Sequence, residues 1–201
     1  MSSAELIAGA LEGRRIELLV IGGSAGGVDA LLKLLPALPD GFGPAVTCIL
    51  HMPADRESRL AELFAARVAL PVREARDKEA IEAGTVYFAG PGYHLSVERD
   101  RSFSLSCEPP VHFARPAIDV LMESAADVYG PALAGILLTG ANFDGADGMA
   151  RIRACGGLTV VQDPEEAQVG TMPAEAIRRC APHLVLPLDG IRRLLPLLEK
   201  P

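Results

Sequence analysis

The sequence predicts an α/β fold: a doubly wound, mainly parallel sheet with flanking helices and a small antiparallel meander. Two observations predict it. Short β-prone runs alternate with helical segments along most of the 201 residues, the order that crossover connections between parallel strands require. Hydrophobic residues make up 49% of the chain, aromatic residues only 4%, and Trp is absent, so the core is expected to be aliphatic, as in a buried parallel sheet.

The expected strands are short apolar runs bounded by glycine, proline or polar residues. Those assigned to the parallel sheet are residues 16–21, 45–50, 133–138, 158–161 and 184–186. Three more runs alternate apolar and polar residues and are separated by turn signals. We expect these runs to form the antiparallel meander: residues 85–89, 95–98 and 102–106.

The expected helices carry apolar residues three or four positions apart, so that one face of each helix is apolar. They lie around residues 31–35 and at 60–68, 116–129, 144–155, 173–180 and 191–198. Pro36 ends the first of them. Residues 1–15 are expected to be a short lead or a helix fragment, and residues 16–201 a single domain.

Composition excludes several classes of function. The formal net charge of −7 argues against nucleic-acid binding, and the chain has no basic run of the kind that anchors proteins to membranes. With no signal peptide and no apolar stretch of transmembrane length, the protein is expected to be cytoplasmic, without membrane insertion. The four cysteines are scattered, which predicts free, buried thiols rather than a zinc ribbon or redox motif.

The first strand ends in Gly22-Gly23-Ser24-Ala25-Gly26, a G-x-S-x-G pattern at a strand-to-helix turn. Small neighbours leave the Ser24 hydroxyl exposed near a helix N-terminus, which favours a developing oxyanion. The alternative is a glycine-rich phosphate cradle. The dinucleotide fingerprint and the Walker A loop both fail here, yet the pentapeptide alone leaves nucleophile and anion-binding turn about equally supported.

A serine nucleophile needs a base, and the base needs an acceptor that fixes its orientation. His51 follows the second strand directly, and Asp144 follows the strand at 133–138. Taken singly, His51 is more often structural and Asp144 more often a helix N-cap. Carboxyl ends of parallel strands meet at one sheet edge, so the three residues together predict a Ser24–His51–Asp144 triad.

These motifs resemble the catalytic domain of the bacterial chemotaxis protein-glutamate methylesterase CheB, over about residues 18–191. Residues 22–27 and His51-Met52-Pro53 match two of its motifs, and residues 139–148 match its T-G-M-G-x-D-G-A-x-G. Further matches follow in the same order along the chain, at residues 84–87, 91–95, 115–121, 156–164, 172–173, 176–177 and 185–188.

The resemblance implies hydrolysis of γ-glutamyl methyl esters on the helices of methyl-accepting chemoreceptors, with release of methanol, and it allows glutamine deamidation. It implies Ser24 as nucleophile, His51 as base and Asp144 as orienter, without a metal or organic cofactor. Backbone N–H groups of Ala25 and Ala141 are expected to stabilise the oxyanion. The expected substrate contacts are Arg115, Met52 and Asn142. We expect His94 to be structural, and His112 and His183 to lie at the surface.

The chain departs from the family pattern in three places. Ala141-Asn142 replaces Met-Gly, and residues 54–56 replace Pro-Gly-Phe at the edge expected to meet the receptor. The family usually begins with a receiver domain of about 100 residues, whereas only residues 1–15 precede the first strand. A non-catalytic docking module of the same fold is the alternative function, and a nucleotide-binding domain is a weaker one.

Overall fold

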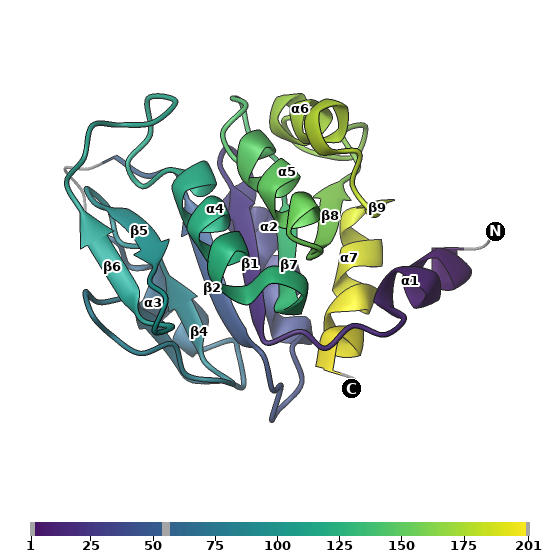
Figure 1. Ribbon diagram of the computed structural model, residues 1–201, viewed down its shortest axis with the longest axis horizontal. Coiled ribbons are helices and arrows are strands. Elements are labelled where there is room, and N and C mark those ends of the chain that lie inside the picture. Colours follow the sequence, from purple (N-terminus) through teal and green to yellow (C-terminus); the bar gives the residue numbers. More distant parts are fainter. Residues whose placement is uncertain (1–2, 54–56, 200–201) are drawn as a thin grey trace.

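A seven-stranded parallel sheet forms the centre of the computed structural model, which describes residues 3–53 and 57–199 (Figure 1). The strand order is β3-β4-β2-β1-β7-β8-β9, and every pairing is parallel. The strands β2, β3 and β4 lie on one side of β1, and β7, β8 and β9 lie on the other, which confirms the doubly wound prediction. The strands are β1 (Leu18–Gly23), β2 (Ala45–Leu50), β3 (Val72–Glu74), β4 (Val86–Phe88), β7 (Leu133–Leu137), β8 (Leu158–Gln162) and β9 (Leu184–Leu186).

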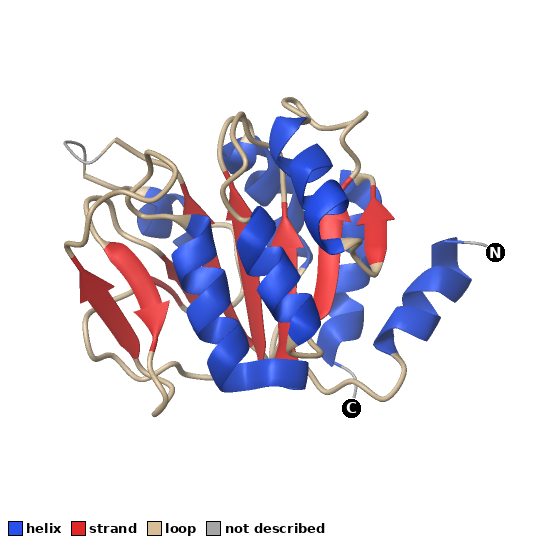
Figure 2. Ribbon diagram, turned by 45° about the horizontal axis from the view of Figure 1, so that its top comes forward, coloured by secondary structure: helices blue, strands red, loops and turns tan. Residues whose placement is uncertain are grey.

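Helices cover both faces of the sheet, as Figure 2 shows. One apolar core lies beneath α2 (Gly27–Leu34), α3 (Leu60–Ala65) and α7 (Leu188–Leu194). The other lies beneath α4 (Ile118–Tyr129), α5 (Ala146–Ala154) and α6 (Thr171–Cys180). In the described ranges 3–53 and 57–199, no helix has both the length and the apolar character needed to cross a membrane.

The predicted meander is smaller than expected. The antiparallel sheet has two strands, β5 (His94–Val97) and β6 (Phe103–Ser106), whereas the run at 85–89 supplies β4 of the parallel sheet. Both faces of β4 are covered: Phe88 stacks on Phe64 at 5.0 Å between ring centroids, and Tyr87 meets Phe103 edge-on at 4.9 Å. A strand buried on both faces belongs inside the layered sheet. The three-residue β3, which pairs with β4, was not predicted.

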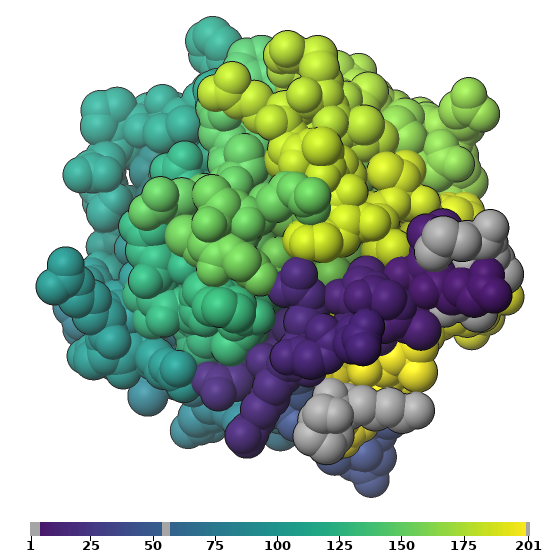
Figure 3. Space-filling model, turned by 45° about the vertical axis from the view of Figure 1, so that its right-hand side comes forward, coloured from purple at the N-terminus to yellow at the C-terminus, as the bar shows by residue number. Residues whose placement is uncertain are grey.

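Residues from Ser3 onward form a helix, α1 (Ser3–Leu11), so the helix-fragment alternative for the N-terminal segment is correct for the described part. Ile7 packs into the core with only 8% of its surface exposed. Figure 3 shows this purple segment lying against the yellow C-terminal part of the chain. Short 3₁₀ helices lie at Leu35–Ala37, Gly130–Ala132 and Leu195–Glu199.

The cysteine prediction is correct in one part and wrong in the other. All four cysteines lie in the described ranges and are free thiols. Cys48 and Cys180 are buried, but Cys155 is half-buried and Cys107 is exposed on the loop after β6.

Candidate active site

Ser24 and His51 directly follow the ends of the neighbouring strands β1 and β2. In the register of β1 and β2, Gly23 pairs with Leu50, and the two predicted residues follow these partners directly. The His51 amide donates to the carbonyl of Gly23 (3.4 Å), and the Ser24 amide donates to the carbonyl of Thr139 (2.9 Å), which follows β7. Neighbouring strands lie about 4.8 Å apart, so the strand ends bring both side chains to one edge.

Asp144 is fully buried and faces His51. Its Oδ2 lies 2.6 Å from His51 Nε2 and also accepts a hydrogen bond from the Ile118 amide (2.7 Å), while Oδ1 accepts one from the Asp119 amide (3.0 Å). Burial by itself raises the pKa of Asp144, but the hydrogen bonds from His51, Asp119 and Ile118 outweigh it and hold the pKa below its usual value. The carboxyl group is therefore kept ionised and aimed at the imidazole.

The N-cap alternative for Asp144 is wrong. Gly145 occupies the N-cap position of α5, and no side chain caps that helix. Asp144 instead accepts the first two amides of α4, which comes from a distant part of the chain. Its lone pairs thus link the N-terminus of α4 to the loop before α5, and this explains why a buried carboxylate is tolerated there.

Ser24 occupies the turn before α2, whose N-cap Gly26 has a left-handed φ of 81°. A Cβ at Gly26 would meet Gln168 Oε1 at 2.5 Å, so a larger residue would not fit this turn. Across the described residues, no hydrogen bond joins Ser24 Oγ to His51 Nδ1 or Nε2. Such hydrogen bonds are often longer in free enzymes and shorten when substrate binds.

Two backbone N–H groups, in the loops that follow β1 and β7, have no hydrogen-bond partner among the described residues. The amides of Ala25 and Ala141 donate to no other described residue, and both residues are exposed. Thr139 Oγ1 fixes the loops that carry them, because it donates to the carbonyl of Ala25 (2.8 Å) and accepts from the amide of Val169 (2.9 Å). Free, fixed amides of this kind can bind a developing oxyanion.

The comparisons with known proteins show the family and the fold of the chain. The family model described as CheB methylesterase matches residues 19–195, nearly the whole chain. The chain belongs to the CheB methylesterase family. The crystal structure of the Thermotoga maritima CheB methylesterase catalytic domain superposes with a TM-score of 0.85 at 31% identity, covering 90% of this chain and 98% of that one.

Curated relatives match most of the chain. A putative protein-glutamate methylesterase/protein-glutamine glutaminase of Leptospira interrogans is 42% identical over 184 residues, covering 92% of this chain and 95% of the relative. The protein-glutamate methylesterase/protein-glutamine glutaminase of Symbiobacterium thermophilum is 39% identical over 174 residues. The match covers 87% of this chain but only 48% of that longer protein.

A pocket of about 590 Å³ opens beside His51. Three residues expected to contact substrate line it with His51: Met52, Arg115 and Asn142. Arg115 Nη1 donates to the carbonyls of Cys107 (3.0 Å) and Glu108 (3.1 Å), so part of this side chain holds the loop that precedes it. Ser24 does not line this pocket, and residues 54–56 lie outside the described residues.

Asn142 stands where the family pattern has glycine, yet its backbone is not left-handed. Its Oδ1 accepts a hydrogen bond from the amide of Asp144 (3.2 Å), a local side-chain turn of the kind that asparagine favours. The replacement therefore braces the loop that carries the candidate orienter.

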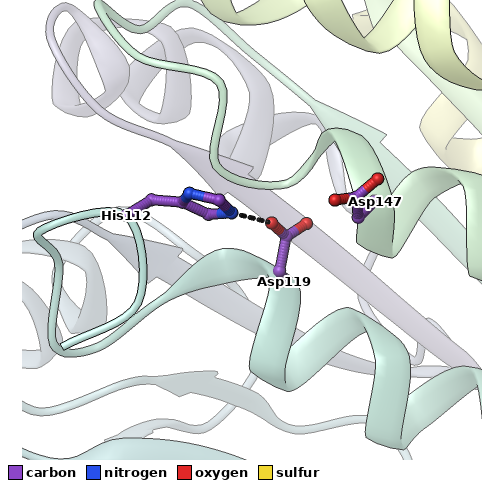
Figure 4. Close-up of side chains that lie close together, drawn as sticks. All are labelled: His112, Asp119 and Asp147. Carbon is purple, nitrogen blue, oxygen red and sulfur yellow. Dashed lines mark ion pairs between the residues drawn. The ribbon is translucent and has the colours of Figure 1, made fainter. Parts of the chain in front are cut away.

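Sequence reasoning missed a second carboxylate–imidazole pair next to the first. Asp119, buried in the first turn of α4, has its Oδ2 3.2 Å from His112 Nε2, and Asp147 lies beside them (Figure 4). Ligand atoms of the three side chains lie within 4.8 Å of one another, a donor set that divalent cations accept, but Asp147 also pairs with Arg179. Asp119 follows the matched Arg-Pro motif, which was the available signal.

Only one of the two carboxylate oxygens of Asp119 accepts a hydrogen bond from the described residues. Its Oδ1 accepts from the Gly148 amide (2.7 Å), whereas its buried Oδ2 accepts no hydrogen bond from the described residues. Burial raises the pKa of Asp119 to about 7, and the charge of Asp144 adds to the shift. One face of this carboxyl group is therefore held by α5 and the other faces His112.

The remaining histidines differ in how well they were predicted. His94 is structural, as expected: it is 1% exposed, Nδ1 accepts from the Ala117 amide (3.2 Å) and Nε2 lies 3.1 Å from the Pro109 carbonyl. His112 and His183 were expected at the surface, and both are half-buried there. The packed sheet edge buries His183, whose Nδ1 accepts from the Thr159 amide (3.1 Å).

Proposed function

We propose that this protein is a serine esterase that hydrolyses glutamyl methyl esters on methyl-accepting chemoreceptors and releases methanol. One observation carries the proposal: the 2.6 Å contact between His51 Nε2 and the buried Asp144, at the sheet edge where Ser24 follows the neighbouring strand. Family membership and the names of the relatives support the substrate class. We propose residues 16–201 as its single catalytic domain, acting in the cytoplasm.

In the proposed mechanism His51 accepts the proton of Ser24 as Oγ attacks the ester carbonyl. Because Nε2 faces Asp144, Nδ1 is the ring nitrogen left for this transfer. Asp144 orients the ring and stabilises the imidazolium that forms. Ser24 precedes the N-terminus of α2, whose positive dipole end favours negative charge on the attacking oxygen.

The tetrahedral intermediate places its oxyanion on the amides of Ala25 and Ala141, which have no other partner among the described residues. The imidazolium then protonates the leaving methoxide, and methanol departs. Water, deprotonated by His51, attacks the γ-glutamyl ester of Ser24, and the glutamate carboxylate is released. The same steps with an amide release ammonia, which is the glutaminase reaction named in the relatives. No step needs a metal or an organic cofactor.

Substrate contacts are proposed for the pocket residues Met52, Arg115 and Asn142, which lie beside His51. Met52 offers apolar surface to the ester methyl and methylene groups. Arg115 places a positive charge in this pocket although the net charge of the protein is negative, which suits an acidic group on the protein substrate.

Replacing the nucleophile tests the proposal. Ser24→Ala should lower hydrolysis of p-nitrophenyl acetate and methanol release from a methylated chemoreceptor by at least about 10³-fold, with an unchanged circular dichroism spectrum. Ser96→Ala, at a half-buried position on β5, is the matched control and should retain activity. Equal activity of Ser24→Ala and wild type would refute the assignment. An inactive wild type that still binds receptor would favour the docking module instead.

A further inference from the structure

The loop at residues 107–115, here called the lip, forms one wall of the pocket beside His51. At its tip Val111 and Ala114 exchange backbone hydrogen bonds in both directions (3.1 and 2.8 Å) across a two-residue turn. The two central residues, His112 and Phe113, have φ angles of 49° and 64°. A turn with two left-handed residues favours asparagine and glycine, so a histidine followed by a phenylalanine is an unfavourable choice for the backbone.

Side-chain contacts compensate for the unfavourable backbone conformation at His112 but not at Phe113. The His112 ring pairs with Asp119 and meets the Phe143 ring edge-on, at 4.7 Å between centroids. The Phe113 side chain is 101% exposed, as fully surrounded by solvent as a side chain can be. Strain that no internal contact explains is typical of functional positions.

The base of the lip is fixed by its own polar groups. Arg115 Nη1 donates to two lip carbonyls, and the ring of the buried His94 lies within hydrogen-bond distance of a third, that of Pro109. With His112 held by Asp119 near the tip, the loop is anchored at both ends. Phe113 is therefore presented from a fixed turn, which lowers the entropy lost when a partner packs against it.

We infer that Phe113 is a recognition residue that packs against an apolar side chain of the protein substrate, one helical turn from the target glutamyl ester. The inference rests on the proposed function. Phe113 lines the same pocket as His51, and Met52 adds apolar surface there. Exposed aromatic residues beside a catalytic pocket are typical interface anchors, and residues three or four positions apart share one face of a helix.

Two helical peptides test this partner. Each carries one γ-methyl glutamate, followed four residues later by leucine in one peptide and by serine in the other. Wild type should hydrolyse the leucine peptide with a kcat/KM at least about tenfold higher, mainly through KM, because the leucine packs on the exposed ring. Phe113→Gly should lose this preference while retaining the wild-type rate on p-nitrophenyl acetate.

Glycine suits a left-handed turn, and a fully exposed ring contributes no packing, so the Tm of Phe113→Gly should not fall. A purely structural role would lower the Tm and both activities together, and that result would overturn the inference. Val185→Ala, at an exposed position on β9, is the control and should match wild type on both peptides.

Other outcomes separate the two proposals. If wild type hydrolyses neither peptide nor p-nitrophenyl acetate, the proposed function fails. If wild type hydrolyses both peptides equally, or Phe113→Gly keeps the preference for leucine, the inference fails while the esterase stands. A wild-type dimer in light scattering that becomes a monomer in Phe113→Gly would assign the ring to a second copy of the chain, and would also overturn the inference.

Discussion

Two loops face the pocket beside His51, and their main side chains differ in burial. The loop at residues 139–145 buries Asp144 completely and gives both carboxylate oxygens hydrogen-bond partners. The lip at residues 107–115 leaves Phe113 fully exposed on a strained turn. A group that carries out chemistry must be held in one geometry, whereas a group that recognises a partner must remain available to it. The contrast separates the proposed catalytic wall from the proposed recognition wall.

The largest effect is expected at Asp144, because both of its carboxylate oxygens accept hydrogen bonds. Asp144→Asn should lower kcat for p-nitrophenyl acetate by about 10³–10⁴-fold, since an amide cannot keep His51 in the required tautomer and has one acceptor oxygen for two α4 amides. Asp147→Asn is the control, because Asp147 is half-buried and pairs with Arg179. It should stay within about threefold of wild type. If Asp144→Asn lowered kcat by less than tenfold, the distinction between the two loops would be lost.

Sequence reasoning reached the first loop because its residues follow from a simple rule. Strand ends of a parallel sheet share one edge, so the residues after β1, β2 and β7 had to meet there. Their polar character marked Ser24, His51 and Asp144 as candidates. The partners of Asp144 could not be read in this way, because the amides that it accepts belong to α4, whose packing against α5 no local pattern specifies.

The lip was harder to predict for a physical reason. Its two-residue turn has no glycine or asparagine, the residues that signal left-handed turns, so nothing marked residues 111–114 as a hairpin. The assignment of residues 85–89 to the meander failed for a different reason. Tyr87 and Phe88 pack against opposite layers, and an alternating pattern cannot distinguish a strand with one buried face from one covered on both.

The second prediction tests the backbone that carries Asp144. Gly145 has a φ of 95°, and a Cβ there would lie 2.6 Å from Leu137 Cδ1 and 2.9 Å from Ile118 Cγ2. Gly145→Ala should lower the free energy of unfolding in urea by about 2–4 kcal/mol, from backbone strain plus overpacking. Gly41→Ala is the matched control, since its φ is 78° but nothing lies within 4 Å.

Gly41→Ala should lower the free energy of unfolding by about 1 kcal/mol, the contribution of backbone strain alone. The difference between the two variants then measures how tightly β7 and α4 are packed against the loop that carries Asp144. Equal losses for Gly145→Ala and Gly41→Ala would mean that this loop yields as easily as an exposed turn, and the comparison between the two walls would lose its structural basis.

A pH-dependent effect is expected at Asp119, where the lip meets the loop that carries Asp144. Burial, with the neighbouring charge of Asp144, raises its folded-state pKa to about 7, well above the ordinary value of 3.8. Between these values the folded protein keeps a proton that the unfolded chain releases. The contribution of Asp119 to stability is therefore lost as pH rises from about 4 to about 7, with a slope of at most about 1.4 kcal/mol per pH unit.

Asp119→Asn keeps an acceptor for the Gly148 amide but does not titrate, so it should remove this loss. Urea unfolding of wild type and variant across pH 4–8 should show the variant gaining relative stability as pH rises through this window. The groups that face Asp119 (His112, Asp144 and Asp147) remain in both proteins. Asp127→Asn, on the exposed side of α4, should follow wild type throughout. A constant difference between wild type and Asp119→Asn would show that folding does not raise the pKa of Asp119, and would contradict the prediction.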